Sequence, residues 1–174
     1  PRVGIMRGPG GIDFDELGKQ FQYGNIKFFY TVSRYHNPTG QSYTKKEREE
    51  LVRLADKYNV YIVEDDIAAD FETDTKRDPV YFSDIYDKVI YIKSFSKILM
   101  PGLRLAAVVL PPLLLNVFLD YKQWTDTYSA ILSQGALTIF LESGMYQKNR
   151  KEIRRIYMDR MKKLKDTAAG IDTG

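Results

Sequence analysis

The distribution of apolar and polar positions along the 174-residue chain predicts strands that alternate with helices. Four runs rich in β-branched and aromatic residues have the length of a single strand, and their continuous apolarity is typical of strands buried on both faces of a sheet. These runs span residues 27–33, 60–64, 88–93 and 104–110. Because a helical segment separates the first two strands, the order predicts an α/β fold with a mostly parallel sheet and crossover helices.

Apolar residues at helical spacing predict the remaining elements. The clearest helix start is Thr44-Lys45-Lys46-Glu47, a capping box whose side chains bond the free backbone N–H groups of the first turn. Further helices are predicted over residues 13–21, 113–127, 133–142 and 146–167. One face of the last helix carries five apolar residues: Ile153, Ile156, Tyr157, Met161 and Leu164. Residues 8–11, Gly-Pro-Gly-Gly, predict a turn and not a phosphate loop, because no Gly-Lys-Ser or Gly-Lys-Thr follows them.

Composition excludes several classes of protein. With 44% hydrophobic and 28% charged residues the chain has the balance of a globular domain and not of a disordered one. It contains no cysteine, which excludes a disulfide scaffold. The dense apolar stretch 103–119 is interrupted by Arg104, two prolines and Asn116, so it does not predict a membrane-spanning helix. No signal peptide is visible, and we expect a cytoplasmic protein that does not bind membranes.

The net charge of +3 hides a local excess of basic residues. Residues 146–166 hold nine basic and three acidic side chains. A basic stripe on one helix is typical of a solvated face, and it does not by itself indicate a nucleic-acid interface.

Polar clusters follow three of the predicted strands, at the edge where ligands bind in open α/β sheets. The clusters are residues 36–40 (His-Asn-Pro-Thr-Gly), 64–66 (Glu-Asp-Asp) and 94–97 (Ser-Phe-Ser-Lys), and Arg104 follows the last of them by seven positions. Together they place an amide, a carboxylate, an amine and a guanidinium in one crevice. A lysine can form a Schiff base with an aldehyde, a carboxylate can keep a pyridinium nitrogen protonated, and arginine and serine suit a phosphate. This set describes a site for pyridoxal phosphate.

These motifs resemble those of the class I/II aminotransferases, the fold-type-I pyridoxal phosphate enzymes, and the resemblance spans residues 10–165. It implies a three-layer αβα large domain with a mostly parallel sheet, in which the strand after Arg104 is the antiparallel member. By this resemblance Lys97 carries the internal aldimine and Asp65 pairs with the pyridine nitrogen, with Asp66 as the rival candidate. It also implies that Asn37 bonds the 3-oxygen of the ring, and that Ser94 and Arg104 bind the phosphate.

The resemblance further implies that the chain is a fragment of a longer protein. Residues 1–145 correspond to part of the cofactor-binding large domain, and residues 146–174 to the long helix that leads towards a small domain. The family's phosphate loop, its ring-stacking aromatic residue and its substrate-binding arginine are not in the sequence. We therefore expect an incomplete cofactor pocket here, and a homodimer in the intact parent.

One departure from the family pattern bears on function. Aminotransferases place a tyrosine three residues after the pyridine aspartate, and the related GntR/MocR regulators often place it two residues after; here those positions are Ala68 and Ile67. The segments 70–72 and 154–160 resemble the regulators, which bind DNA through a separate winged helix-turn-helix domain. We expect the effector-sensing domain of such a regulator, with an amino-acid-like ligand. The alternatives are a true aminotransferase that moves an amino group between an amino acid and a 2-oxo acid, and a domain that has lost the cofactor.

Overall fold

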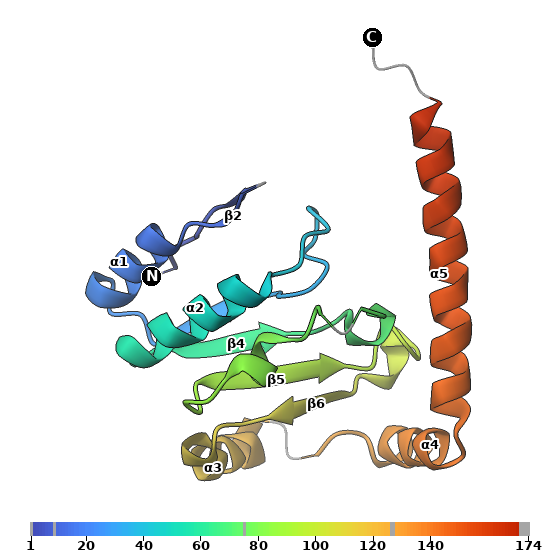
Figure 1. Cartoon of the computed structure of the whole chain (residues 1–174). Coiled ribbons are helices and arrows are strands. Elements are labelled where there is room, and N and C mark those ends of the chain that lie inside the picture. Colours follow the sequence, from blue (N-terminus) through green and yellow to red (C-terminus); the bar gives the residue numbers. More distant parts are fainter. Residues whose placement is uncertain (1, 9, 75, 126–127, 171–174) are drawn as a thin grey trace.

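A four-stranded sheet forms the centre of the computed structural model, which describes residues 2–8, 10–74, 76–125 and 128–170 (Figure 1). Its strands lie in the order β3 (Phe28–Thr31), β4 (Tyr61–Asp65), β5 (Val89–Ser94) and β6 (Ala106–Val109). The first three run parallel, and β6 is antiparallel to β5. The predicted α/β fold with a mostly parallel sheet is confirmed, as is the antiparallel strand after Arg104.

Two amphipathic helices, α1 (Phe14–Tyr23) and α2 (Lys45–Lys57), lie over one face of this sheet (Figure 1). The predicted capping box starts α2: the Thr44 hydroxyl accepts from the Glu47 backbone N–H, and the Glu47 carboxylate accepts from the Thr44 backbone N–H. Apolar residues of both helices and of the strands form the main core, whose fully buried members include Leu17, Leu51, Val60, Ile62 and Val89. The first three predicted strands and both helices are therefore held together by one core.

The prediction that all four strands are buried on both faces was wrong for this chain. On β3, Phe28 and Tyr30 remain 60% and 55% exposed, and all four residues of β6 are exposed. On β4, buried and half-buried residues alternate. The reason is that α1 and α2 cover only one face, so among the described residues the opposite face of β3 lacks a covering layer.

A short antiparallel pair, β1 (Arg7–Gly8) and β2 (Gly11–Ile12), precedes α1. It flanks the turn predicted for residues 8–11, of which Pro9 lies outside the described residues. Gly11 adopts φ +94°, and a Cβ atom there would lie 2.3 Å from the Glu47 carboxylate, so both backbone and space favour glycine.

Helices α3 (Leu115–Thr125), α4 (Ile131–Glu142) and α5 (Met145–Ala169) follow the sheet. Short 3₁₀ helices lie between several of these elements: η1 (Ala69–Phe71), η2 (Val80–Ser83), η3 (Pro101–Leu103) and η4 (Pro112–Leu114). In the part of the chain that the structure describes, no helix is both long and apolar enough to cross a membrane.

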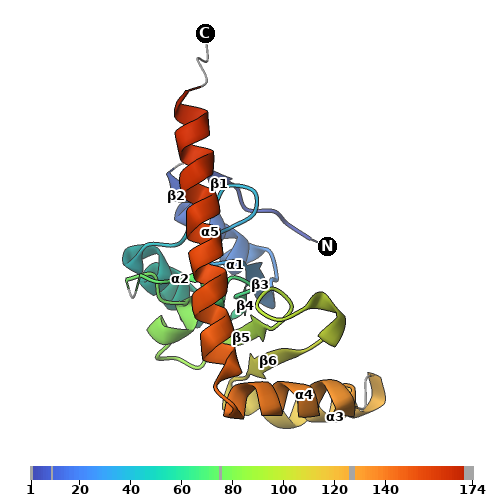
Figure 2. The same ribbon diagram turned by 90° about the vertical axis from the view of Figure 1, so that its right-hand side faces the viewer.

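The predicted long helix exists as α5, but most of its apolar face is uncovered. Ile153 packs against a second core cluster, and the Tyr157 ring lies 4.7 Å from that of Phe71. Met161 and Leu164 are more than half exposed, because the C-terminal half of α5 extends away from the sheet (Figures 1 and 2). Residues 171–174 of the predicted segment 146–174 lie outside the described residues.

The base of α5 is fixed to the sheet by a polar cluster. The Lys93 ammonium donates to Asp70 Oδ1 and to the Tyr146 hydroxyl, both at 2.9 Å, and the Tyr146 hydroxyl donates to the same Asp70 oxygen. The Arg154 guanidinium donates to the backbone carbonyl of Asp70. This cluster joins β5, η1 and α5 beside the loop that carries Lys97.

Candidate active site

The strand register brings the polar clusters to one edge of the sheet. Thr31 pairs with Glu64 and Asp65 pairs with Ile92, so the carboxyl ends of β3, β4 and β5 lie side by side. Ser94 pairs with Ala106 at the start of the antiparallel β6. The segments that carry Asn37, Asp65, Ser94, Lys97 and Arg104 therefore all leave the sheet at this edge.

Asn37 lies in a loop that hydrogen bonds to itself. The His36 backbone N–H donates to the Gln41 carbonyl at 2.8 Å, and the Gly40 N–H donates to the His36 carbonyl at 2.6 Å. At the base of the loop, the Tyr43 N–H donates to the Ser33 carbonyl at 2.8 Å. The Asn37 side chain is exposed, which leaves its amide available to a ligand at the edge.

Asp66 lies in a buried ion pair that sequence reasoning did not find. Its Oδ1 accepts from Arg34 Nε at 3.0 Å, and its Oδ2 accepts from Arg34 Nη2 and, at 2.7 Å, from the Tyr91 hydroxyl. The Arg34 Nη1 group donates to the Arg77 carbonyl at 3.2 Å. Asp66 is 1% exposed and both of its oxygens are occupied. The acidic run 64–66 gave no signal of this pairing, because Arg34 is distant in sequence.

Asp65, the last residue of β4, is half-buried and has a free oxygen. Its Oδ2 accepts from the Tyr30 hydroxyl at 2.7 Å, and among the described residues no group donates to Oδ1. Of the two candidate carboxylates, Asp65 is therefore the one that can receive a hydrogen bond from a ligand, which favours it over Asp66 on geometry as well as on resemblance.

Glu64, the third acid of the run, is fully buried on the opposite face of β4. Its carboxylate accepts from the Ser33 hydroxyl and from the backbone N–H groups of Val80 and Tyr81, at 2.7 and 2.9 Å for the backbone donors. Burial raises the pKa of Glu64, against the opposing effect of these donors. Glu64 therefore ties β3 and η2 to the strand and is not accessible to a ligand.

Lys97 projects from a turn whose neighbours are anchored. Phe95 and Ile98 are buried with Leu105 and Tyr146 in the second core cluster, and Asn149 of α5 donates to the Ile98 carbonyl at 2.7 Å. The Lys97 side chain is exposed, and among the described residues no hydrogen bond or ion pair involves it. An anchored backbone with a free ammonium group suits a nucleophilic amine.

Ser94 and Arg104 flank the Lys97 turn. The Ser94 hydroxyl accepts from the Ser96 backbone N–H at 3.2 Å. Arg104 adopts a left-handed conformation, φ +53°, at the end of η3, which is uncommon for a residue other than glycine. Its side chain is exposed, and within the described part of the chain no carboxylate pairs with it. A hydroxyl and an unpaired guanidinium beside a free amine are groups that can receive a phosphate.

The structure offers no hydroxyl donor at the two positions where the resemblance implies a tyrosine, Ile67 and Ala68. Ile67 and Ala68 follow β4 in a turn, and neither side chain can donate a hydrogen bond. The Tyr91 hydroxyl is committed to Asp66. Among the predicted site residues, Asn37 has an exposed amide that can donate a hydrogen bond to a ligand.

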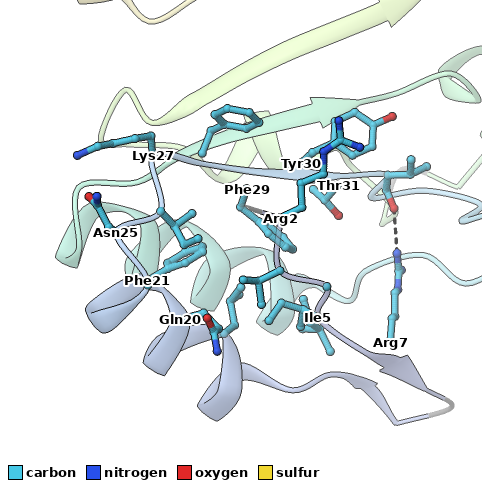
Figure 3. A pocket seen from close by; sticks show the side chains of 18 of the residues that line it. Arg2, Ile5, Arg7, Gln20, Phe21, Asn25, Lys27, Phe29, Tyr30 and Thr31 are labelled. Atoms are coloured by element: carbon cyan, nitrogen blue, oxygen red, sulfur yellow. Dashed lines mark hydrogen bonds between the residues drawn. The ribbon is translucent and has the colours of Figure 1, made fainter.

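A separate cavity of about 810 Å³ lies along the outer side of β3 (Figure 3). Its wall is formed by the N-terminal segment, α1 and β3, and Arg7 Nη1 donates to the Val32 carbonyl at 2.9 Å at one end. Tyr30 and His36 line this cavity and bring it towards the edge that carries Asp65. It does not contain Lys97 or Arg104 in its lining.

Comparisons with known proteins show which family the chain is similar to. A family profile described as aminotransferase class I and II matches residues 6–173. An HTH-type transcriptional regulator of Bacillus subtilis, YcxD, is 46% identical over 164 residues, covering 94% of this chain and 37% of that protein. An aminotransferase of Saccharolobus solfataricus, SSO0104, is 32% identical over 157 residues, covering 86% of this chain and 39% of that protein.

The fold is also similar to that of a solved aminotransferase structure. The kynurenine aminotransferase of Pyrococcus horikoshii, crystallised with PMP, superposes with a TM-score of 0.87 at 26% identity, covering 97% of this chain and 43% of that one. The chain thus spans about two fifths of the length of these proteins.

Proposed function

Because the chain belongs to the aminotransferase class I and II family, we propose that it is part of a pyridoxal-phosphate-binding domain that senses an amino-acid-like effector in a GntR/MocR-type transcriptional regulator. One observation carries this proposal: the segments that bear three ligand-binding groups leave the sheet at the same edge. The groups are the Lys97 amine, the Asp65 carboxylate with one oxygen available, and the Arg104 guanidinium. The regulator origin is supported by the 46% identity to a protein named as an HTH-type regulator.

The residues of the edge fit the cofactor group by group. When bound, pyridoxal phosphate supplies an aldehyde for covalent attachment and a ring that withdraws electrons. Lys97 would present the amine for attachment, and Asp65 Oδ1 would accept a hydrogen bond from the protonated pyridine nitrogen. Ser94 and Arg104 would bind the phosphate, and Asn37 would donate to the ring oxygen. These roles rest on the geometry of the edge together with the resemblance.

Sensing is favoured over efficient turnover by the residues after β4. A tyrosine hydroxyl on the ring oxygen would stabilise its anionic form and help to set the proton affinity of the attached nitrogen. Ile67 and Ala68 cannot supply it, and Tyr91 already donates to Asp66. We propose that the cofactor binds while amino-group transfer is slow.

In this proposal the intact protein contains further segments outside this chain. In this proposal residues 1–145 form part of the cofactor-binding domain and residues 146–174 lead from it. DNA would be bound by a domain outside these residues, the parent would be a homodimer, and it would work in the cytoplasm, where a DNA-binding regulator acts.

The alternative is a true aminotransferase, which the 32% identity to a protein named as an aminotransferase supports. The deciding experiment titrates the full-length parent with pyridoxal phosphate and follows the visible absorption band of the bound cofactor. A panel of amino acids is then added. The proposal expects a band that Lys97→Ala lacks and that amino acids perturb without rapid loss. Turnover at ordinary aminotransferase speed would support the enzyme, and no binding would indicate a domain that has lost the cofactor.

A further inference from the structure

Tyr30 contacts Asp65, the carboxylate that we propose binds the cofactor. Its hydroxyl donates to Asp65 Oδ2 at 2.7 Å, across from β3 to β4. We propose that Tyr30 is a positioning residue, which fixes the Asp65 carboxylate so that its other oxygen meets the pyridine nitrogen. This inference rests on the proposed function, because it assigns a role toward the same cofactor.

The strand register explains how the two side chains meet. Tyr30 pairs with Val63, and Asp65 lies two residues further along β4 on the same face. Such diagonal neighbours are within reach of a long aromatic side chain. The contact therefore follows from the register and the length of tyrosine; a phenylalanine there would fill the same space without the donor.

The chemistry of the pair suits orientation of a carboxylate. Burial, the hydrogen bond to Asp65 and the Asp65 charge raise the pKa of Tyr30 to about 12, so the hydroxyl remains a donor at physiological pH. With Oδ2 held, rotation of the carboxylate is restricted, and Oδ1, to which no described residue donates, remains available to a ligand. Hydrogen-bond partners that orient metal-ligating side chains change metal affinity by about 10- to 100-fold when removed, and we expect an effect near the lower end of that range here.

The contact between Tyr30 and Asp65 contributes little to folding stability, so a role in stability can be distinguished from a role in cofactor binding. Tyr30 is 55% exposed, so water can replace the bond to Asp65 when it is lost. Tyr61, at the other end of β4, provides a matched control: it faces the same side as Asp65, and among the described residues its hydroxyl makes no hydrogen bond.

The test compares Tyr30→Phe, Tyr61→Phe and the wild-type full-length protein. Pyridoxal phosphate affinity is measured by fluorescence titration, the thermal midpoint by unfolding, and the pH midpoint of the bound cofactor's absorption by spectroscopy. We expect Tyr30→Phe to weaken cofactor affinity about tenfold. We also expect it to shift the pH midpoint, because the Asp65 carboxylate loses the hydrogen bond that the Tyr30 hydroxyl donates to it. We expect an unchanged thermal midpoint, and no change of any kind in Tyr61→Phe.

The outcomes separate this inference from the proposed function. Wild-type protein that binds the cofactor through Lys97, with Tyr30→Phe equal to it in affinity and pH midpoint, would overturn the positioning role alone. A loss of affinity accompanied by an equal loss in Tyr61→Phe, or by a lowered thermal midpoint, would also overturn it, because the effect would then be structural. Wild-type protein that does not bind pyridoxal phosphate would overturn the proposed function and this inference with it.

Discussion

Replacing Asp65 and Asp66 one at a time by alanine should have opposite consequences, although the two residues are adjacent. Asp66→Ala leaves the Arg34 guanidinium buried without its counter-ion and the Tyr91 hydroxyl without its acceptor. Breaking a buried ion pair by removing one partner costs about 3–5 kcal/mol of unfolding free energy. Asp65→Ala removes only the acceptor of the exposed Tyr30 hydroxyl, for which about 0.5 kcal/mol is expected.

These magnitudes translate into separate readouts. A loss of unfolding free energy of this size lowers the thermal midpoint, so Asp66→Ala should unfold at a measurably lower temperature than the wild type. Asp65→Ala should leave the midpoint near that of the wild type and weaken pyridoxal phosphate binding more strongly than Asp66→Ala. The assay is thermal unfolding followed by cofactor titration of both variants of the full-length protein, at a temperature where both are folded.

The refuting result is the reverse ranking. If Asp66→Ala folds as stably as the wild type and loses the cofactor, while Asp65→Ala retains it, the pyridine partner is Asp66. The buried pair with Arg34 would then not exist in the functional protein.

Two further predictions concern the neighbouring residues. Ile67→Tyr or Ala68→Tyr should raise the rate of amino-group transfer by roughly 10- to 150-fold, since a hydrogen bond to a charged group contributes about 1.5–3 kcal/mol; unchanged rates in single-turnover measurements would count against the missing donor. Glu64 has a raised folded pKa, so its contribution to stability is present at low pH and is lost as pH rises through that pKa. Urea unfolding should therefore show the advantage of wild type over Glu64→Gln falling as pH rises from about 4, and a pH-independent difference would contradict this.

Local sequence signals predicted the elements well, for physical reasons that act over short distances. The capping box at Thr44 satisfies its own backbone donors and starts α2 where predicted. The strands were found because β-branched and aromatic runs fit a pleated sheet. The edge that gathers Asn37, Asp65 and Lys97 followed from parallel topology, which places the carboxyl ends of strands together.

What the sequence did not reveal depends on contacts between distant residues. The pairing of Arg34 with Asp66 and the contact of Tyr30 with Asp65 join different strands, and no local pattern specifies them. A continuous apolar run also does not show whether the same chain provides the helices that cover each face of the strand. The exposed aromatic side chains of β3 show this, because their apolarity predicted burial and the described residues cover only the opposite face.

The central claim is that Lys97 is the amine to which the cofactor attaches at this edge. The most direct measurement incubates the full-length protein with pyridoxal phosphate, reduces it with borohydride and maps the modified peptide by mass spectrometry. The account predicts one stoichiometric pyridoxyl group on Lys97, and none at any site in Lys97→Ala. A stoichiometric label on another lysine, or a label that persists in Lys97→Ala, would contradict it.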